Sequence, residues 1–73
     1  MKEEILTKFG SRVRKLRLEK EFSQEDLSLV CELDRTYISG VERGVRNVSL
    51  LNIARLAKAL DVSPSELLKF GGE

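Results

Sequence analysis

The fold of this chain is decided by residues 24–42, which read QEDLSLVCELDRTYISGVE. The apolar residues of this stretch recur at helical spacing in two groups, namely Leu27, Val30 and Cys31, then Ile38 and Val41. Ser23 and Asp34 precede the two groups, and serine and aspartate are preferred residues at the start of a helix. The stretch therefore predicts two short helices joined by a tight turn, and Leu33 has the spacing of a residue that plugs this turn into the core.

The second predicted helix has two chemically different faces. One arc of about a quarter-turn carries Arg35, Thr36, Ser39 and Arg43. The opposite side carries Tyr37, Ile38 and Val41. On an isolated helix, such a polar face would simply be solvated. After a capped helix and a tight turn it favours DNA recognition instead, because a helix-turn-helix places its second helix in the major groove.

Four segments of the sequence resemble the Cro/phage-repressor (XRE-type) helix-turn-helix family of DNA-binding domains. They are RVRKLR at 12–17, SQEDL at 23–27, ISGVERG at 38–44 and LAKALDV at 56–62, within a similarity that extends over about residues 9–68. Within the family, DRTYISGVERG followed by RNVSL is most similar to the controller proteins of restriction–modification systems. The resemblance implies an all-α, compact five-helix, lambda-repressor-like domain. It would occupy residues 1–73 as a single domain, with its DNA-binding motif at about 24–43.

Length and composition narrow the function classes. A chain of 73 residues makes one small domain with a marginal core, which dimerisation would help to stabilise. Cys31 is the single cysteine and histidine is absent, so an intrachain disulfide is excluded and neither a metal site nor a cofactor is expected. Without histidine a serine or cysteine nucleophile lacks its usual activating base, so the chain is not expected to be an enzyme, and Cys31 is predicted to be a buried structural thiol.

The sequence also bears on location and charge. No apolar run has the length of a membrane span and no signal-peptide pattern opens the chain, so we expect a cytoplasmic protein with no membrane partner. The formal net charge is only +1, but for DNA binding one basic face matters more than the total. Basic residues crowd the first predicted helix, at Lys8, Arg12, Arg14, Lys15, Arg17 and Lys20, and follow again at Arg35, Arg43 and Arg46.

These patterns predict two classes of DNA contact. Arg35 is expected to make a bidentate contact with a guanine, and Thr36 and Ser39 to touch neighbouring base edges. The predicted contacts to the sugar-phosphate backbone are Gln24, Tyr37, Arg43, Arg46 and Asn47. Among them, Gln24 opens a helix, where its amide and the free backbone N–H groups could both face a phosphate.

The first predicted helix spans about residues 3–20, with a buried stripe formed by Ile5, Phe9, Val13 and Leu16. The resemblance pairs Arg17 with Glu42 in a partly buried ion pair, although a solvent-facing arginine is the plain alternative. Glu21 and Glu32 stand at helix ends where the family usually has glycine, because the backbone there tends to adopt the left-handed conformation. For a residue with a Cβ this conformation costs about 1 kcal/mol. Ser28 similarly replaces the usual alanine between the two motif helices.

The C-terminal third carries more apolar surface than one small core needs. Gly44 is predicted to end the recognition helix, Ser49 to cap a fourth helix at about 50–60, and Pro64 to open a fifth that precedes Gly71 and Gly72. The region at about 50–70 is therefore predicted to dimerise, through Leu50, Ile53, Val62, Leu67, Leu68 and Phe70. The alternative is that Leu68 and Phe70 only cover the bottom of the core.

The resulting hypothesis is a sequence-specific transcription regulator that acts as a homodimer on a palindromic operator. The resemblance suggests a restriction–modification controller that regulates its own operon, while a phage or plasmid repressor of the same fold is the alternative. A protein-interaction module such as an antitoxin is a different class, but its contact face would normally carry aromatic or aliphatic anchors. Glu25 and Asp26 are candidates to touch RNA polymerase, or they simply complement the helix dipole. The resemblance to restriction–modification controllers implies both activation and repression.

Overall fold

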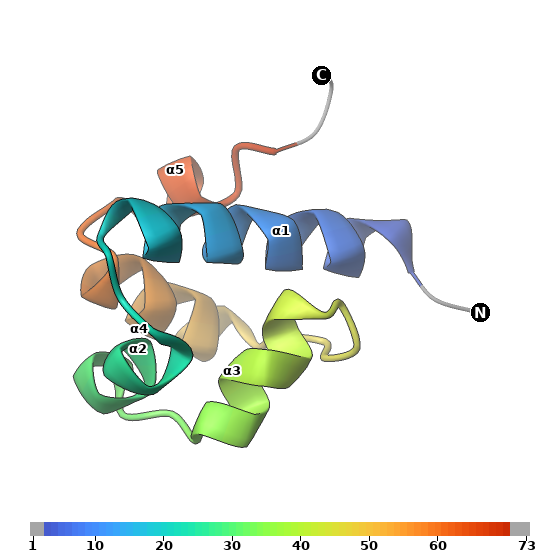
Figure 1. Cartoon of the computed structure of the whole chain (residues 1–73). Helices are drawn as coiled ribbons and strands as arrows, with labels where there is room; N and C mark the ends of the chain where they lie inside the picture. The colour runs from blue at the N-terminus through green and yellow to red at the C-terminus, as the bar shows by residue number, and fades with distance from the viewer. Residues whose placement is uncertain (1–2, 71–73) are drawn as a thin grey trace.

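Five helices and no strand make up residues 3–70, the part of the chain that this computed structural model describes (Figure 1). The helices are α1 (Glu4–Glu19), α2 (Gln24–Cys31), α3 (Arg35–Glu42), α4 (Leu50–Ala59) and α5 (Pro64–Leu67). Helix α1 packs against α3 on one side and α5 on the other, while α2 packs on α3 and α4. This arrangement confirms the predicted five-helix, all-α fold. Within residues 3–70, no helix combines the length and the apolarity needed to cross a membrane.

Side-chain caps set where four of the helices begin. Ser23 closes a capping box at the start of α2, since its Oγ accepts from the Asp26 backbone N–H at 2.9 Å and the Asp26 carboxylate accepts from the Ser23 N–H at 2.9 Å. Asp34 accepts from the Thr36 N–H at 3.4 Å, and Ser49 from the Asn52 N–H at 3.1 Å. These caps were predicted from sequence. Ser63 adds a fourth, on the one-turn helix α5.

Residues in the left-handed backbone conformation follow the ends of α1, α2 and α4. Glu21 and Glu32 have φ angles of 60° and 61°, as predicted, and Asp61 adds an unpredicted third at 59°. A side-chain hydrogen bond also stabilises the turn between α2 and α3, because the Ser28 hydroxyl donates to the Leu33 carbonyl oxygen at 2.6 Å. The serine that replaces the family's alanine therefore stabilises the turn.

The core collects apolar side chains from all five helices, namely Phe9, Val13, Leu16, Leu27, Cys31, Ile38, Val41, Leu56, Ala57, Leu60 and Leu67. One prediction about the core is wrong, and one apolar residue of the motif lies outside the core. Ile5 is 61% exposed because it lies in the first turns of α1, which extend past the elements that cover the rest of the helix (Figure 1). Val30 is 54% exposed because α2 buries Leu27 and Cys31, four residues apart, and turns Val30 outward.

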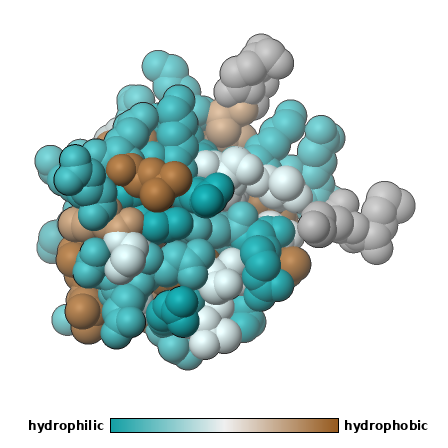
Figure 2. Space-filling view, viewed as in Figure 1, coloured by the Kyte–Doolittle hydropathy of each residue, from teal (hydrophilic) through white to brown (hydrophobic). Residues whose placement is uncertain are grey.

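The predicted dimer surface also needs correction. Leu67 lies fully buried in the core of its own chain, so it is not available to a partner. Phe70 is partly buried and packs edge-on against Phe9, with ring centroids 6.2 Å apart, rather than projecting away from the domain. Gly71 and Gly72, which the sequence places after the fifth helix, lie outside the described residues. The face drawn in Figure 2 is mostly hydrophilic, with small separate hydrophobic patches.

Candidate nucleic-acid interface

Helix α3 separates its apolar and polar faces as the sequence predicts. Ile38 and Val41 are buried against the core, and Gly40 is buried beside them. Arg35 and Thr36 are exposed and Ser39 is half-buried, so the three predicted base-contact residues share one outward surface. The buried side fixes the rotation of the helix about its axis, and this rotation points the polar side away from the protein.

The C-terminal end of α3 is fastened to α1 by a buried ion pair. Arg17 donates to the two carboxylate oxygens of Glu42, at 2.6 Å from Nε and 3.0 Å from Nη2, and also to the Phe22 carbonyl oxygen at 2.8 Å. The two charged side chains are only 8% and 4% exposed. Gly10 allows the helices this close, since a Cβ there would lie 2.7 Å from the Glu42 carbonyl oxygen. The pairing implied by the family resemblance therefore forms.

Gln24 joins the same group of side chains. Its Nε2 donates to the Glu42 carboxylate at 3.1 Å, so the amide is fixed between the start of α2 and the end of α3. One amide hydrogen is used in this bond. The second amide hydrogen and the backbone N–H groups that the Ser23 cap leaves open are what the start of α2 would offer to a phosphate.

The loop after α3 carries the remaining predicted backbone contacts, and Arg43, Arg46 and Asn47 are all exposed. The guanidinium carbon of Arg46 lies 5.5 Å from the centre of the Tyr37 ring. The Tyr37 hydroxyl accepts a hydrogen bond from Asn52 Nδ2 on α4 at 3.2 Å. Sequence reasoning missed Asn52, whose only signal was that it is the one uncharged polar residue of α4.

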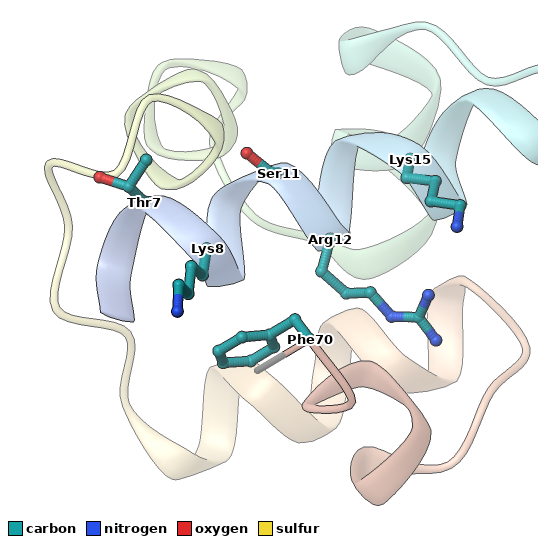
Figure 3. A pocket seen from close by; sticks show the side chains of 6 residues that line it. All are labelled: Thr7, Lys8, Ser11, Arg12, Lys15 and Phe70. Atoms are coloured by element: carbon teal, nitrogen blue, oxygen red, sulfur yellow. The ribbon is translucent and has the colours of Figure 1, made fainter. Parts of the chain in front are cut away.

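The basic residues of α1 do not join this surface as one face. Arg17 is used in the buried pair, and Arg12 bonds to Glu66 on α5, reaching its carbonyl oxygen at 2.9 Å and its carboxylate at 3.3 Å. Arg12, Lys8 and Lys15 line a cavity of about 280 Å³ beside Phe70 (Figure 3). Arg12 and Arg17 are thus engaged in ion pairs within the domain, whereas Arg35, Arg43 and Arg46 are exposed on α3 and in the residues that follow it.

The two acidic residues proposed to contact polymerase differ in their surroundings. Both residues are exposed, but the Asp26 carboxylate accepts a hydrogen bond in the capping box of α2. Asp26 thus has a structural role in the helix start, and Glu25 is the freer of the pair to meet a partner.

Cys31 is buried, and its burial raises the pKa of the thiol, which favours the neutral, unreactive form predicted for it.

A second surface is apolar and lies near the chain's C-terminal end. A hollow of about 180 Å³ is lined by Ile5, Leu6, Phe9, Asn47, Val48, Ile53, Leu68 and Phe70. Leu68 is 44% exposed, and Leu50, at the start of α4, is 79% exposed. Val62 is not with them, because it lines a separate hollow together with Ala54 and Asp61. Three of the predicted interface residues thus share the hollow, and Ile5 joins them unpredicted.

Comparisons with known proteins agree with this geometry. The helix-turn-helix family model, HTH_3, matches residues 13–67. The control protein C.BamHI of Bacillus amyloliquefaciens is 57% identical over 63 residues, which cover 85% of this chain and 78% of that protein. The restriction-modification controller protein C.AhdI from Aeromonas hydrophila has a crystal structure that is 60% identical, with a TM-score of 0.83 over 85% of this chain and 94% of that one. C.Esp1396I bound to a 19 base pair DNA duplex is 40% identical, with a TM-score of 0.84 over 92% and 89% of the two chains.

Proposed function

Because the chain belongs to the helix-turn-helix family and is similar to restriction–modification controller proteins, we propose that it binds a specific DNA operator and controls transcription of its own restriction–modification operon. The observation that carries the proposal is the outward surface of α3, where Arg35, Thr36 and Ser39 stand on a helix fixed by the core and by the Arg17–Glu42 pair. A helix presented in this way has the shape and the donors needed to read base edges in the major groove.

In this proposal the side chains divide between reading and anchoring. Arg35 donates to a guanine, and Thr36 and Ser39 contact neighbouring bases. The anchoring contacts to the DNA backbone come from Gln24, Tyr37, Arg43, Arg46 and Asn47. The family is one of transcription regulators rather than enzymes, and we propose that the chain itself is not catalytic and acts in the cytoplasm, where its operon lies.

The proposal includes a homodimer. The exposed apolar surface that a second copy would cover is formed by Ile5, Leu50, Ile53, Leu68 and Phe70. Pairing through one patch on both copies makes a twofold axis, which would match a palindromic operator with half-sites about 34 Å apart. Burying the patch would also help a domain of this size, whose own core is small. When the protein activates, Glu25 is the residue best placed to meet RNA polymerase.

Selection of bound fragments from random duplex DNA tests the proposal. Enriched fragments are expected to share a palindrome, and binding to it should weaken steeply as salt rises, because each phosphate contact releases counterions. Failure to enrich any shared sequence would contradict the proposed function.

The selected operator then tests the role of Arg35. Arg35→Ala should cost about 1–3 kcal/mol and relax the preference at one base pair in each half-site. Lys15→Ala is the control, since it removes one positive charge from the side of α1 that faces Phe70 (Figure 3). A variant that weakens binding to all sequences equally would make Arg35 a phosphate contact instead.

A further inference from the structure

Asn52 connects α4 to the recognition helix through a single hydrogen bond. Its amide lies 3.2 Å from the Tyr37 hydroxyl, and both residues are half-buried. The pairing does not depend on which amide atom faces the phenol, because a tyrosine hydroxyl both donates and accepts. The bond therefore fixes the direction in which the Tyr37 ring extends from α3.

The fixed ring supports Arg46 from one side. The Arg46 guanidinium carbon lies 5.5 Å from the ring centre, within the range of a cation–π contact. The Arg46 side chain also passes close to Gly40, where an added Cβ would lie 2.9 Å from Arg46 Cγ and 3.0 Å from Nε. The Val45 N–H donates to the Gly40 carbonyl oxygen at 3.0 Å, so the loop backbone is fastened at the same place.

We infer that Asn52 is a positioning residue for DNA binding: by holding Tyr37, it orders Arg46 along α3 before the duplex arrives. An exposed arginine normally loses much rotamer freedom when it binds a phosphate, and a side chain that is already ordered loses less. The inference rests on the proposed function, since the ordered Arg46 acts only on bound DNA. Asn52, a residue of α4, thereby affects the affinity for DNA through Tyr37.

The first test needs no DNA. Tyr37 is the only tyrosine and the chain has no tryptophan, so the intrinsic fluorescence of the protein reports on this ring alone. Asn52→Leu should release the ring and raise its quenching by acrylamide, with little change in the thermal midpoint. Ala54→Leu is the matched control, because it adds the same side chain to the exposed surface of α4 and should leave quenching at the wild-type value. Equal quenching in Asn52→Leu and wild type would overturn the inference.

The second test is a double-mutant cycle with operator DNA. Asn52→Leu should raise Kd about fivefold, because the Arg46 side chain must then be ordered at the moment of binding. Tyr37→Phe keeps the ring but removes the hydroxyl, so it should raise Kd by at least as much, because that hydroxyl is also a proposed contact to the DNA backbone. Adding Asn52→Leu to Tyr37→Phe should then change Kd by less than about twofold, because the shared interaction is already gone.

The cycle separates the inference from the function on which it rests. If the Asn52→Leu penalty persists in full in the Tyr37→Phe background, Asn52 acts independently of Tyr37 and the inference is wrong. The inference is also wrong if Asn52→Leu leaves Kd unchanged in a protein that keeps Tyr37. Failure of the wild-type protein to bind any selected duplex would instead refute the proposed function.

Discussion

The recognition helix α3 is held at two places by contacts of opposite character. At its C-terminal end Glu42 forms a two-point ion pair with Arg17, and both side chains are almost completely removed from solvent. On its outer side Tyr37 makes one neutral hydrogen bond to Asn52 and supports an exposed Arg46. The first contact joins α3 to α1, and the second joins it to α4 and to the loop that follows.

The difference separates what stabilises the fold from what prepares the DNA-binding surface. Removing one member of a buried ion pair leaves a charge that water cannot reach, which is costly. Removing one member of a half-buried neutral pair leaves groups that water can still reach, so the folded state loses little. Substitutions in the buried pair should therefore lower mainly the stability of the fold, and substitutions in the outer contact should lower mainly the affinity for DNA.

The largest expected effect comes from breaking the buried pair. Glu42→Ala leaves the Arg17 guanidinium uncompensated and should lower the free energy of unfolding by about 3–5 kcal/mol. Chemical unfolding followed by circular dichroism, at one fixed protein concentration, measures this loss. Glu25→Ala is the control, because it removes an exposed carboxylate from α2 and should change stability by less than about 0.5 kcal/mol.

Replacing both partners sharpens this prediction. Arg17→Met with Glu42→Leu removes both charges and should recover much of the stability lost in Glu42→Ala. A single substitution that costs no more than Glu25→Ala would mean that the pair does not hold α3, and the contrast between the two places would fail.

A smaller effect is expected from the exposed apolar surface, which contributes neither to the buried pair nor to the outer contact. Leu68→Asp should weaken dimerisation by about 2 kcal/mol, because the partner would have to bury a carboxylate where it met a leucine. Sedimentation over a range of concentrations measures the change, and operator affinity should fall with it. Leu18→Asp is the control, at a leucine of α1 that is exposed to a similar extent but belongs neither to the hollow nor to the proposed dimer surface. A wild-type protein that stays monomeric on a palindromic duplex would contradict the proposed dimer.

Local signals explain why much of this structure could be predicted. Ser23, Asp34 and Ser49 cap the helices that they precede, and Glu21 and Glu32 are left-handed, because capping and chain reversal depend on residues close in sequence. The Arg17–Glu42 pair was found only through the family resemblance, since its members are 25 positions apart.

What the sequence did not reveal depends on how the helices meet in space. Helical periodicity predicts that Ile5 lies on the apolar side of α1, but it does not say whether a neighbouring element covers that end of the helix. In the same way, Leu67 reads as surplus apolar surface until the short α5 places it in the core. The bond between Asn52 and Tyr37 joins two helices whose separation is set by the packing of both against the core, so no local pattern could indicate it.

At the outer contact, where Arg46 lies over Tyr37, a substitution should weaken DNA binding more than it lowers stability. Arg46→Ala should change the free energy of unfolding by less than about 0.5 kcal/mol, because the side chain is exposed. Operator binding should weaken by about 1 kcal/mol, and the slope of log K against log salt should fall by about one unit, because one phosphate contact is lost. Fluorescence anisotropy at several salt concentrations gives both values. An unchanged slope would remove Arg46 from the DNA interface.

The smallest effect is expected at the turn that positions the other end of α3. Glu32 has a φ of 61°, a conformation that costs a residue with a Cβ about 1–2 kcal/mol and costs glycine almost nothing. Glu32→Gly should therefore stabilise the protein, but by no more than about 1 kcal/mol, because glycine also gives the unfolded chain more freedom to lose. Glu25→Gly, inside α2, should destabilise by about 1 kcal/mol, since there the helix gains no relief from strain. Chemical unfolding of the two variants side by side makes the comparison, and a destabilised Glu32→Gly would show that the Glu32 side chain contributes more to this turn than its backbone strain costs.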